Sequence, residues 1–297
     1  MLMSTVTDVA LVFEGGGMRA SYSSGVLAAL LEAGVFCDWV GGISAGSSCT
    51  ANYLARDAAR ARKSFVNLVT EPNFGDWRTF LQGKGMFNAE WIYEHTSGPD
   101  QPLPYDFGKF LANPARFRIG SIRCSDAKMF YWGRQDVPDH EALMKRVRAS
   151  STMPLLMPWT TIDGEDYCDG ALGPSGGIAL DAARADGYEK FLVVLTRERG
   201  YRKPAARLAS VHRALLRKYP AVAEALLERP ANYNRTLDEL LELEASGAAY
   251  VIAPPWMPIG NSERDMDKLA AMYDVGYGQA RREIARILDF VGLPDPA

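Results

Sequence analysis

A serine between two glycines is the first feature of this chain that could do chemistry. Residues 42–46 read Gly-Ile-Ser-Ala-Gly, the G-x-S-x-G pattern that places a serine on a sharp turn between a strand and a helix. Gly42 and Gly46 would allow the backbone to approach closely around Ser44, and the start of the following helix favours negative charge. The pattern predicts that Ser44 is a nucleophile for acyl transfer.

A glycine-rich loop lies upstream of this serine. Residues 14–19 read Glu-Gly-Gly-Gly-Met-Arg. Gly15, Gly16 and Gly17 offer consecutive backbone N–H groups, free of side chains, at the start of a predicted helix. Such donors can stabilise the oxyanion of a tetrahedral intermediate, so the loop is predicted to be an oxyanion hole. Arg19 is predicted to brace the loop.

The general base decides what kind of serine site this is. Of the three histidines, His95, His140 and His212, only His212 follows Asp169, as the order Ser–acid–His of α/β-hydrolases would require. His212 falls in an amphipathic helix, and all three are predicted to be surface or loop residues. Asp169 leaves a strand and precedes Gly170, which allows a tight turn. We therefore predict a two-residue site in which Asp169 takes the proton of Ser44.

The elements that must position these residues have the pattern of a parallel α/β unit. Along the chain they are a strand at 9–13, a helix at 21–33, a short strand beginning at 38–40 and a helix at 45–62. Parallel strands end at the same edge of a sheet, and ligands bind outside their carboxyl ends. The glycine loop and the serine turn are therefore predicted to be neighbours.

The remaining chain shows further strand and helix patterns and no repeat or linker. We expect strands at 118–122 and 128–132, with an antiparallel direction considered for the second, a helix at 141–150, a hairpin at 160–168 that leads into Asp169, a strand at 191–195, helices at 207–228 and 236–245, a strand at 250–253 and helices within 262–290. The interpretation is a single domain over 1–297, with a motif-bearing core at about 8–200 and a helical extension at about 201–297.

Two apolar segments could border a substrate. Residues 72–107 are rich in aromatic side chains, which predicts the core of a helical cap, with a lid or a lipid-facing rim as the alternative. Residues 153–159 read Met-Pro-Leu-Leu-Met-Pro-Trp and are predicted to line an acyl pocket.

The composition limits which ligands and partners we expect for this chain. The net charge of −3 gives no basic surplus for nucleic acid. The four cysteines form no C-x-x-C pair or metal-ligand spacing, so reduced thiols and no metal or other cofactor are expected. No secretory signal or membrane span is visible in the sequence, which favours a cytoplasmic protein, with peripheral contact at the inner face of a membrane left open.

Taken together, the glycine loop, the G-x-S-x-G turn and the Asp169–Gly170 pair resemble the patatin-like phospholipase family. The segment 149–151, followed by two prolines, is similar to the family as well, whereas Glu14 stands where the family usually has Asp and Ala20 where it often has Gly. The resemblance implies a three-layer α/β/α fold with a mainly parallel central sheet and additional C-terminal helices. It also implies a metal-free acyl hydrolase of phospholipase A or lysophospholipase type, acting on lipid or other acyl esters. By that resemblance Ser44 is the nucleophile, Asp169 the base, and the oxyanion donors are Gly15, Gly16, Gly17 and Met18.

Other functions are compatible with parts of the pattern. A transacylase or a non-catalytic lipid-binding protein could use the same fold. Gly15-x-Gly17-x-x-Ala20 also fits a dinucleotide fingerprint, which would make the chain an oxidoreductase. That fold needs an acidic residue at the end of the second strand, where this chain has Gly41–Ser44.

Overall fold

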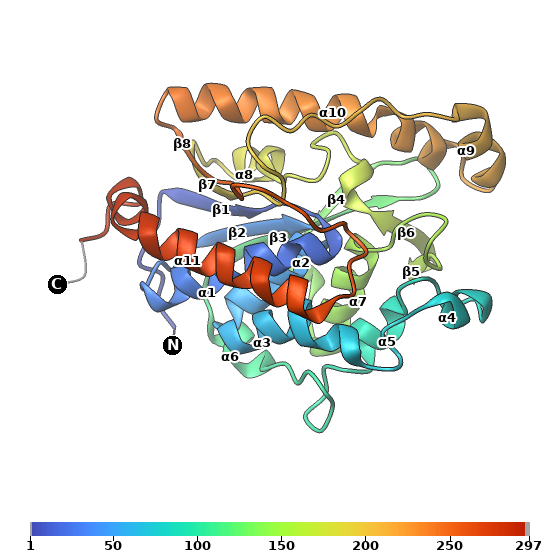
Figure 1. The fold of residues 1–297 in the computed structure, drawn as a ribbon, viewed down its shortest axis with the longest axis horizontal. Helices are drawn as coiled ribbons and strands as arrows, with labels where there is room; N and C mark the ends of the chain where they lie inside the picture. The colour runs from blue at the N-terminus through green and yellow to red at the C-terminus, as the bar shows by residue number, and fades with distance from the viewer. Residues whose placement is uncertain (1, 295–297) are drawn as a thin grey trace.

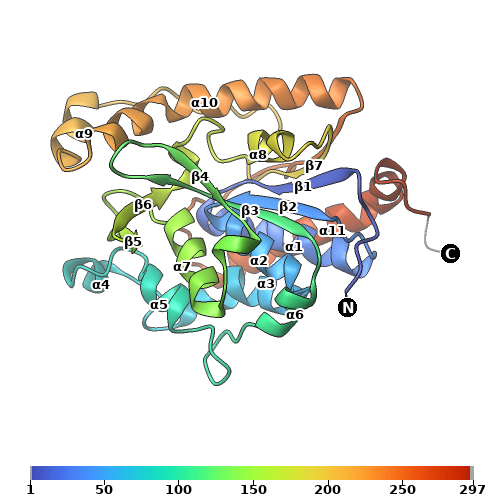
Figure 2. The same ribbon diagram turned by 180° about the vertical axis from the view of Figure 1, so that it is seen from behind.

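The computed structural model describes residues 2–294, and its centre is an eight-stranded mixed sheet (Figures 1 and 2). The strand order is β5-β6-β3-β2-β1-β7-β8, and β4 pairs with β3 outside this path. The strands are β1 (Val9–Phe13), β2 (Trp39–Ile43), β3 (Arg116–Arg123), β4 (Met129–Trp132), β5 (Thr160–Ile162), β6 (Glu165–Asp169), β7 (Lys190–Val194) and β8 (Ala249–Ile252).

Strand direction divides the sheet into two parts. β3, β2, β1, β7 and β8 run parallel, whereas β4, β6 and β5 are antiparallel to their neighbours. In register, Phe13 at the end of β1 faces Gly42 of β2 on one side and Val194 of β7 on the other. The glycine loop, the serine turn and the segment after β7 therefore leave the sheet at one edge, as the parallel pattern predicts.

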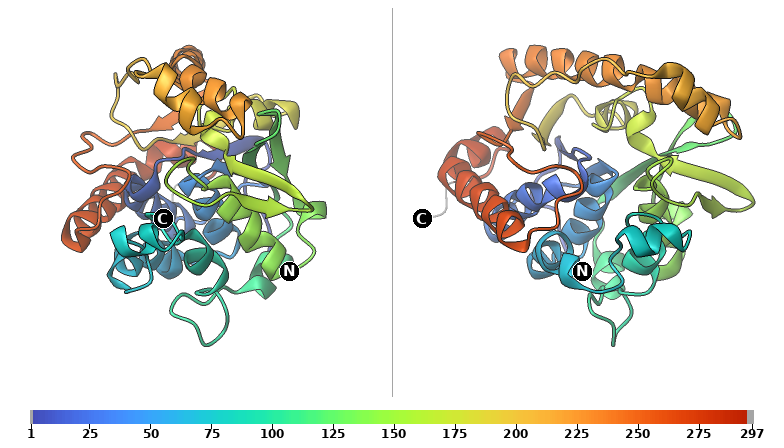
Figure 3. Two further views of the ribbon diagram at one scale, coloured as in Figure 1. Left: turned by 90° about the vertical axis from the view of Figure 1, so that its right-hand side faces the viewer. Right: turned by 45° about the vertical axis from the view of Figure 1, so that its right-hand side comes forward.

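Helices cover both faces of the sheet and give a three-layer α/β/α arrangement (Figures 1 and 3). One face carries α1 (Ala20–Glu32), α2 (Ala45–Leu54), α3 (Ala58–Arg62) and α11 (Met266–Phe290). The other carries α8 (Leu180–Ala185) and the long α10 (Pro220–Ala245). The side chains of β1 alternate between the two buried cores: Val9, Leu11 and Phe13 belong to one, Ala10 and Val12 to the other.

The C-terminal part of the chain completes this same sheet. The strand expected at 250–253 is β8, which pairs in parallel with β7, and α11 packs against α1. Shorter helices complete the fold: α4 (Trp77–Leu81), α5 (Ala89–Glu94), α6 (Phe107–Ala112), α7 (His140–Ser150) and α9 (Ala209–Leu215). Of these, α6 lies at the amino edge of the sheet, just before β3 begins.

Two predicted helix boundaries are wrong. The helix expected at 45–62 is broken after Leu54, because Arg56 adopts a positive φ of 49° and Asp57 begins α3 by accepting the Arg60 N–H at 2.8 Å. The helices expected at 207–228 and 236–245 are instead α9 and one continuous α10. α10 begins with Pro220 at its first turn and continues through Pro230.

Within residues 2–294, no helix is both long enough and apolar enough to cross a bilayer.

Candidate active site

Ser44 lies on a strained turn between β2 and α2. Its φ of 57° and ψ of −127° are uncommon for a residue with a side chain, and such values cluster at functional sites. The Ser44 N–H donates to the Ser150 hydroxyl at 2.9 Å, and the Ser44 carbonyl accepts the Ser47 N–H at 2.9 Å. The turn is therefore held from both sides, and Ser150 is a supporting residue that reasoning from the sequence did not single out.

The glycines around the turn are required by close backbone contact. A Cβ atom at Gly42 would overlap the Gly46 carbonyl, and one at Gly46 would overlap the carbonyl of Phe13. Gly170, after the aspartate, likewise has no room for a side chain against the carbonyl of Gly120. These three glycines hold β1, β2, β3 and the two predicted catalytic turns close together.

Asp169 is the last residue of β6 and is buried at 6% exposure. Its N–H donates to the Thr152 carbonyl at 2.8 Å, and its carboxylate accepts the Ala171 N–H at 2.9 Å. Burial raises the pKa of Asp169 above its ordinary value, while the charge of Arg229, the Ala171 N–H and the Ser44 hydroxyl act in the opposite direction. The structure thus brings Ser44 and Asp169 together, and the positive charge of Arg229 acts on the Asp169 carboxylate.

The histidines lie elsewhere. His95 is exposed and 3.8 Å from the Glu90 carboxylate, and His212 is half-buried on α9. His140 is half-buried rather than on the surface, because it stacks on Tyr105 with ring centroids 5.8 Å apart. None of them lines the cavity beside Ser44.

Some backbone N–H groups of the glycine loop already donate to carbonyl groups of the protein, and others do not. Gly15 donates to the Gly177 carbonyl and Met18 to the Asn261 carbonyl, both at 3.0 Å. Within residues 2–294, the N–H groups of Gly16 and Gly17 have no acceptor. Gly15 packs directly behind the nucleophile, since a Cβ there would lie 3.0 Å from the Ser44 Cβ. Of the four predicted donors, Gly16 and Gly17 are therefore those whose N–H groups are not already used within residues 2–294.

Thr196, the residue two positions after β7, braces this loop. Its hydroxyl donates to the Gly15 carbonyl at 3.0 Å, and its N–H donates to the buried Glu14 carboxylate at 2.5 Å. In the described part of the chain the Arg19 Nε is buried without an acceptor, and the charge of Glu14 acts on Arg19, so a bracing role for Arg19 stays a prediction. Glu14 ties the loop to β7 through its carboxylate.

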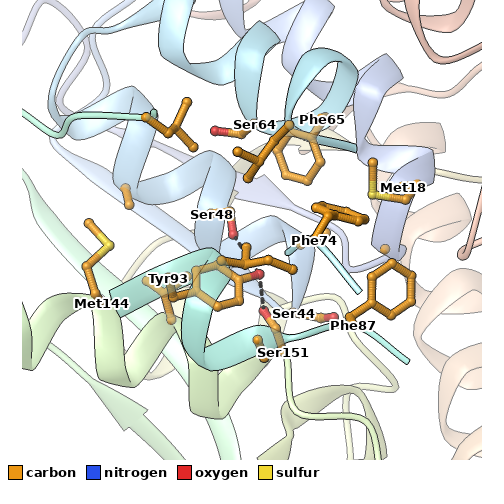
Figure 4. A pocket seen from close by; sticks show the side chains of 18 of the residues that line it. Met18, Ser44, Ser48, Ser64, Phe65, Phe74, Phe87, Tyr93, Met144 and Ser151 are labelled. Atoms are coloured by element: carbon orange, nitrogen blue, oxygen red, sulfur yellow. Dashed lines mark hydrogen bonds between the residues drawn. The ribbon is translucent and has the colours of Figure 1, made fainter. Parts of the chain in front are cut away.

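A largely apolar cavity opens beside Ser44 (Figure 4). The segment 72–107 supplies much of its wall, and residues 153–159 contribute Met153 and Met157. Met18 also points its side chain into the cavity, consistent with a lining role. The lining residues from the segment 72–107 are Phe74, Phe87, Ala89, Ile92, Tyr93 and Leu103.

The Tyr93 hydroxyl is a polar group in the lining of this cavity. The Tyr93 hydroxyl donates to Ser151 Oγ at 3.1 Å and accepts from Ser48 Oγ at 3.4 Å (Figure 4). Burial raises the pKa of Tyr93, and the negative charge of Asp169 adds to this effect. Tyr93 is therefore a neutral hydroxyl close enough to Asp169 to be affected by its charge. No sequence motif predicted this residue.

Other reactive groups do not compete with the serine. Burial raises the pKa of Cys49 and Cys168, so these thiols stay protonated. In residues 2–294 no group of three or more His, Cys, Asp or Glu side chains could hold a metal ion.

Comparison with known proteins agrees with this arrangement. The family model for patatin-like phospholipase matches residues 11–180, more than half of the chain, and a model for a domain of unknown function matches 219–292. An uncharacterised Escherichia coli protein, YjjU, is 28% identical over 191 residues, which cover 63% of this chain and 52% of that protein, so the chain spans about half of its length. The crystal structure of VipD from Legionella pneumophila shares the fold, with a TM-score of 0.51 at 11% identity over 94% of this chain and 67% of that one. This chain therefore belongs to the patatin-like phospholipase family.

Proposed function

We propose that this protein is a serine acyl hydrolase that cleaves carboxylic esters of lipids, of phospholipase A or lysophospholipase type. The observation that carries the proposal is the convergence of three features at one point. A strained Ser44 faces a buried Asp169, two free loop N–H groups lie next to it, and an apolar cavity opens beside it. The cavity is lined mainly by apolar and aromatic side chains, with Ser44, Ser48 and Ser151 among its few polar groups, as is usual for sites that bind apolar ligands.

The chemistry follows from these positions. The Ser44 hydroxyl attacks the ester carbonyl while Asp169 accepts its proton. The N–H groups of Gly16 and Gly17 stabilise the oxyanion, and the alcohol or lysolipid leaves with the proton from Asp169. Water, deprotonated by Asp169, then attacks the acyl-enzyme, and the fatty acid leaves as Asp169 returns the proton to the Ser44 oxygen. No metal or cofactor is part of this proposal.

A panel of p-nitrophenyl esters from acetyl to long acyl chains tests the activity. We expect turnover to rise with chain length until the cavity is filled, and a fluorophosphonate to label Ser44. A transacylase on the same site would label equally but would transfer the acyl group to an added alcohol in preference to water. A non-catalytic lipid-binding protein would show neither turnover nor labelling.

Peripheral contact with a membrane is proposed for one end of the molecule, to the right in Figure 1. There α4, residues 155–159 and α9 expose large apolar side chains. Phe80, Leu155, Leu156 and Leu215 border one shallow groove, and Trp77 and Leu81 are 69% and 83% exposed. Because α4 belongs to the segment that also walls the cavity, lipid docked on this rim would be close to the cavity lining.

Replacing Leu81 with aspartate is expected to weaken binding to phospholipid vesicles by about tenfold or more, because one buried leucine contributes roughly 1.5–3 kcal/mol. Vesicle co-sedimentation measures this change. Leu241→Asp is the matched control, since Leu241 is also exposed but lies on α10. Equal binding by wild type and both variants would show that the rim does not contact lipid.

A further inference from the structure

Four cationic side chains gather near the dyad without ion-pair partners. They come from the turn after the glycine loop, the segment after β7, and α10, and are named here the cation cluster (Arg19, Arg197, Lys203 and Arg229). The charges of Arg197 and Arg229 act on Arg19, and the charges of all three arginines act on Lys203. The negative charge of Glu14 acts on both Arg19 and Lys203 in the opposite direction.

The cluster has unused hydrogen-bond donors. No ion pair involves these four side chains in residues 2–294, and the Nε atoms of Arg19, Arg197 and Arg229 are buried without an acceptor. Arg19 is only 6% exposed. By contrast, Arg148, whose Nε is also buried, ion-pairs with two glutamates through its other nitrogens. Arg197, Lys203 and Arg229 are half-buried and therefore reachable from solvent, whereas Arg19 is buried. Because a buried cation is costly without enough compensating negative charge, the excess positive charge around Arg19 points to an anionic ligand.

Aromatic rings orient two of the cations. The Arg197 guanidinium lies 4.5 Å from the Tyr201 ring centroid, and the Lys203 ammonium lies 4.6 Å from that of Tyr233. The two rings pack edge to face at 6.2 Å. Such packing fixes the positions of the charges while leaving their N–H groups free to donate.

The cluster borders the catalytic segments from the face opposite the apolar cavity. Arg229 is close enough to act on Asp169, and one turn later on α10 the backbone of Tyr233 packs on Gly176. The next residue, Gly177, accepts the Gly15 N–H. Tyr233 belongs to the core under α10, whereas the cavity walls belong to the other core. The two features thus approach the dyad from opposite faces of the sheet.

The donor chemistry suits a phosphate group. Arginine presents a planar fork that pairs with two phosphate oxygens, and lysine adds a compact charge. Burial, followed by the neighbouring cations, lowers the pKa of Lys203 to about 8, and a bound anion would favour its charged form. Arg197, Lys203 and Arg229 all lie outside the residues 11–180 matched by the family model.

We propose that the cation cluster binds the phosphate group of an anionic acyl-ester substrate whose acyl chain occupies the apolar cavity and whose ester carbonyl reaches Ser44. The proposal rests on the hydrolase function proposed above and gives that function a substrate class.

The test compares one monoacylglycerol with the same molecule carrying a 3-phosphate. In the double variant Arg197→Gln/Lys203→Gln, the ratio of kcat/KM for the phosphorylated over the neutral ester is expected to fall about tenfold or more. Arg202→Gln is the matched control, because Arg202 adjoins Lys203 but is exposed and paired with Asp238. In parallel, the melting temperature is measured with inorganic phosphate and with potassium chloride at the same ionic strength. Phosphate should raise the melting temperature of the wild type more than of the double variant.

The outcomes separate the possibilities. A phosphate-dependent stabilisation that needs the cluster, with an unchanged substrate ratio, would mean that the site binds free phosphate and would overturn the head-group assignment. No phosphate effect and no change in ratio would overturn the site itself. Cluster-dependent phosphate binding without turnover of either ester would support the site while removing the proposed hydrolase function.

Discussion

Replacing Asp169 with asparagine is expected to lower kcat by roughly four orders of magnitude, and Ser44→Ala by roughly four to six. Asparagine keeps the oxygen that accepts the Ala171 N–H at 2.9 Å, so the β6 turn should be preserved. Its amide cannot accept the proton of Ser44, and no histidine lines the cavity to replace it. Initial rates on a p-nitrophenyl ester of the preferred chain length measure both losses.

Folding must be shown to survive in the Asp169 variant. Because burial raises the pKa of Asp169, its ionised form costs folding free energy above the ordinary carboxyl pKa. Asparagine removes that cost, so the variant should melt at or above the wild-type temperature at neutral pH. Asp163→Asn on the exposed turn of the same hairpin is the control and should retain full activity. Wild-type turnover in a folded Asp169→Asn protein would exclude the dyad.

The pH profile gives the dyad an independent signature. Asp169 can act as a base only when ionised, so kcat/KM should fall as the pH drops through its raised pKa. The groups acting on or facing this carboxylate are Arg229, the Ala171 N–H, Ser44, Tyr93 and Cys168. Arg229→Gln removes a positive charge that lowers this pKa, so the acidic limb should move to higher pH. An unmoved limb would mean that Arg229 does not act on the base.

Local signals were sufficient to predict the framework of the site. The apolar run at 9–13 coincides with β1, and the hairpin expected at 160–168 delivers Asp169 as predicted. Gly42, Gly46 and Gly170 are informative in the sequence because each permits a backbone contact that a Cβ atom would prevent. Short glycine motifs can therefore be recognised in the sequence, even where the backbone that requires the glycine, such as Phe13 for Gly46, lies far along the chain.

The unpredicted parts depend on partners distant in the sequence. The N–H groups of Gly15 and Met18 are used by Gly177 and Asn261, which no local pattern links to the glycine loop. The continuity of α10 through Pro230 likewise depends on tertiary packing, which overrides the usual helix-breaking effect of proline.

Replacing Gly16 with alanine is expected to lower kcat by about two to three orders of magnitude, the usual loss for one oxyanion donor. A Cβ there would lie 2.5 Å from Thr196 Oγ1, and the loop must shift to relieve the contact. That shift moves the N–H groups of Gly16 and Gly17 away from the developing oxyanion, so kcat should fall more than KM changes.

A double variant separates this mechanism from general damage. Thr196→Gly removes the three atoms that a Cβ at Gly16 would approach most closely, and it also removes the hydroxyl that bonds the Gly15 carbonyl. Gly16→Ala should therefore reduce kcat less in the Thr196→Gly protein than in the wild type. Gly278→Ala on α11 is the control, because its Cβ would meet only the flexible end of Arg282 at 3.2 Å. Undiminished kcat in Gly16→Ala would show that the loop supplies no donor to the transition state. A raised KM with unchanged kcat would instead restrict the loop to binding the substrate in its ground state.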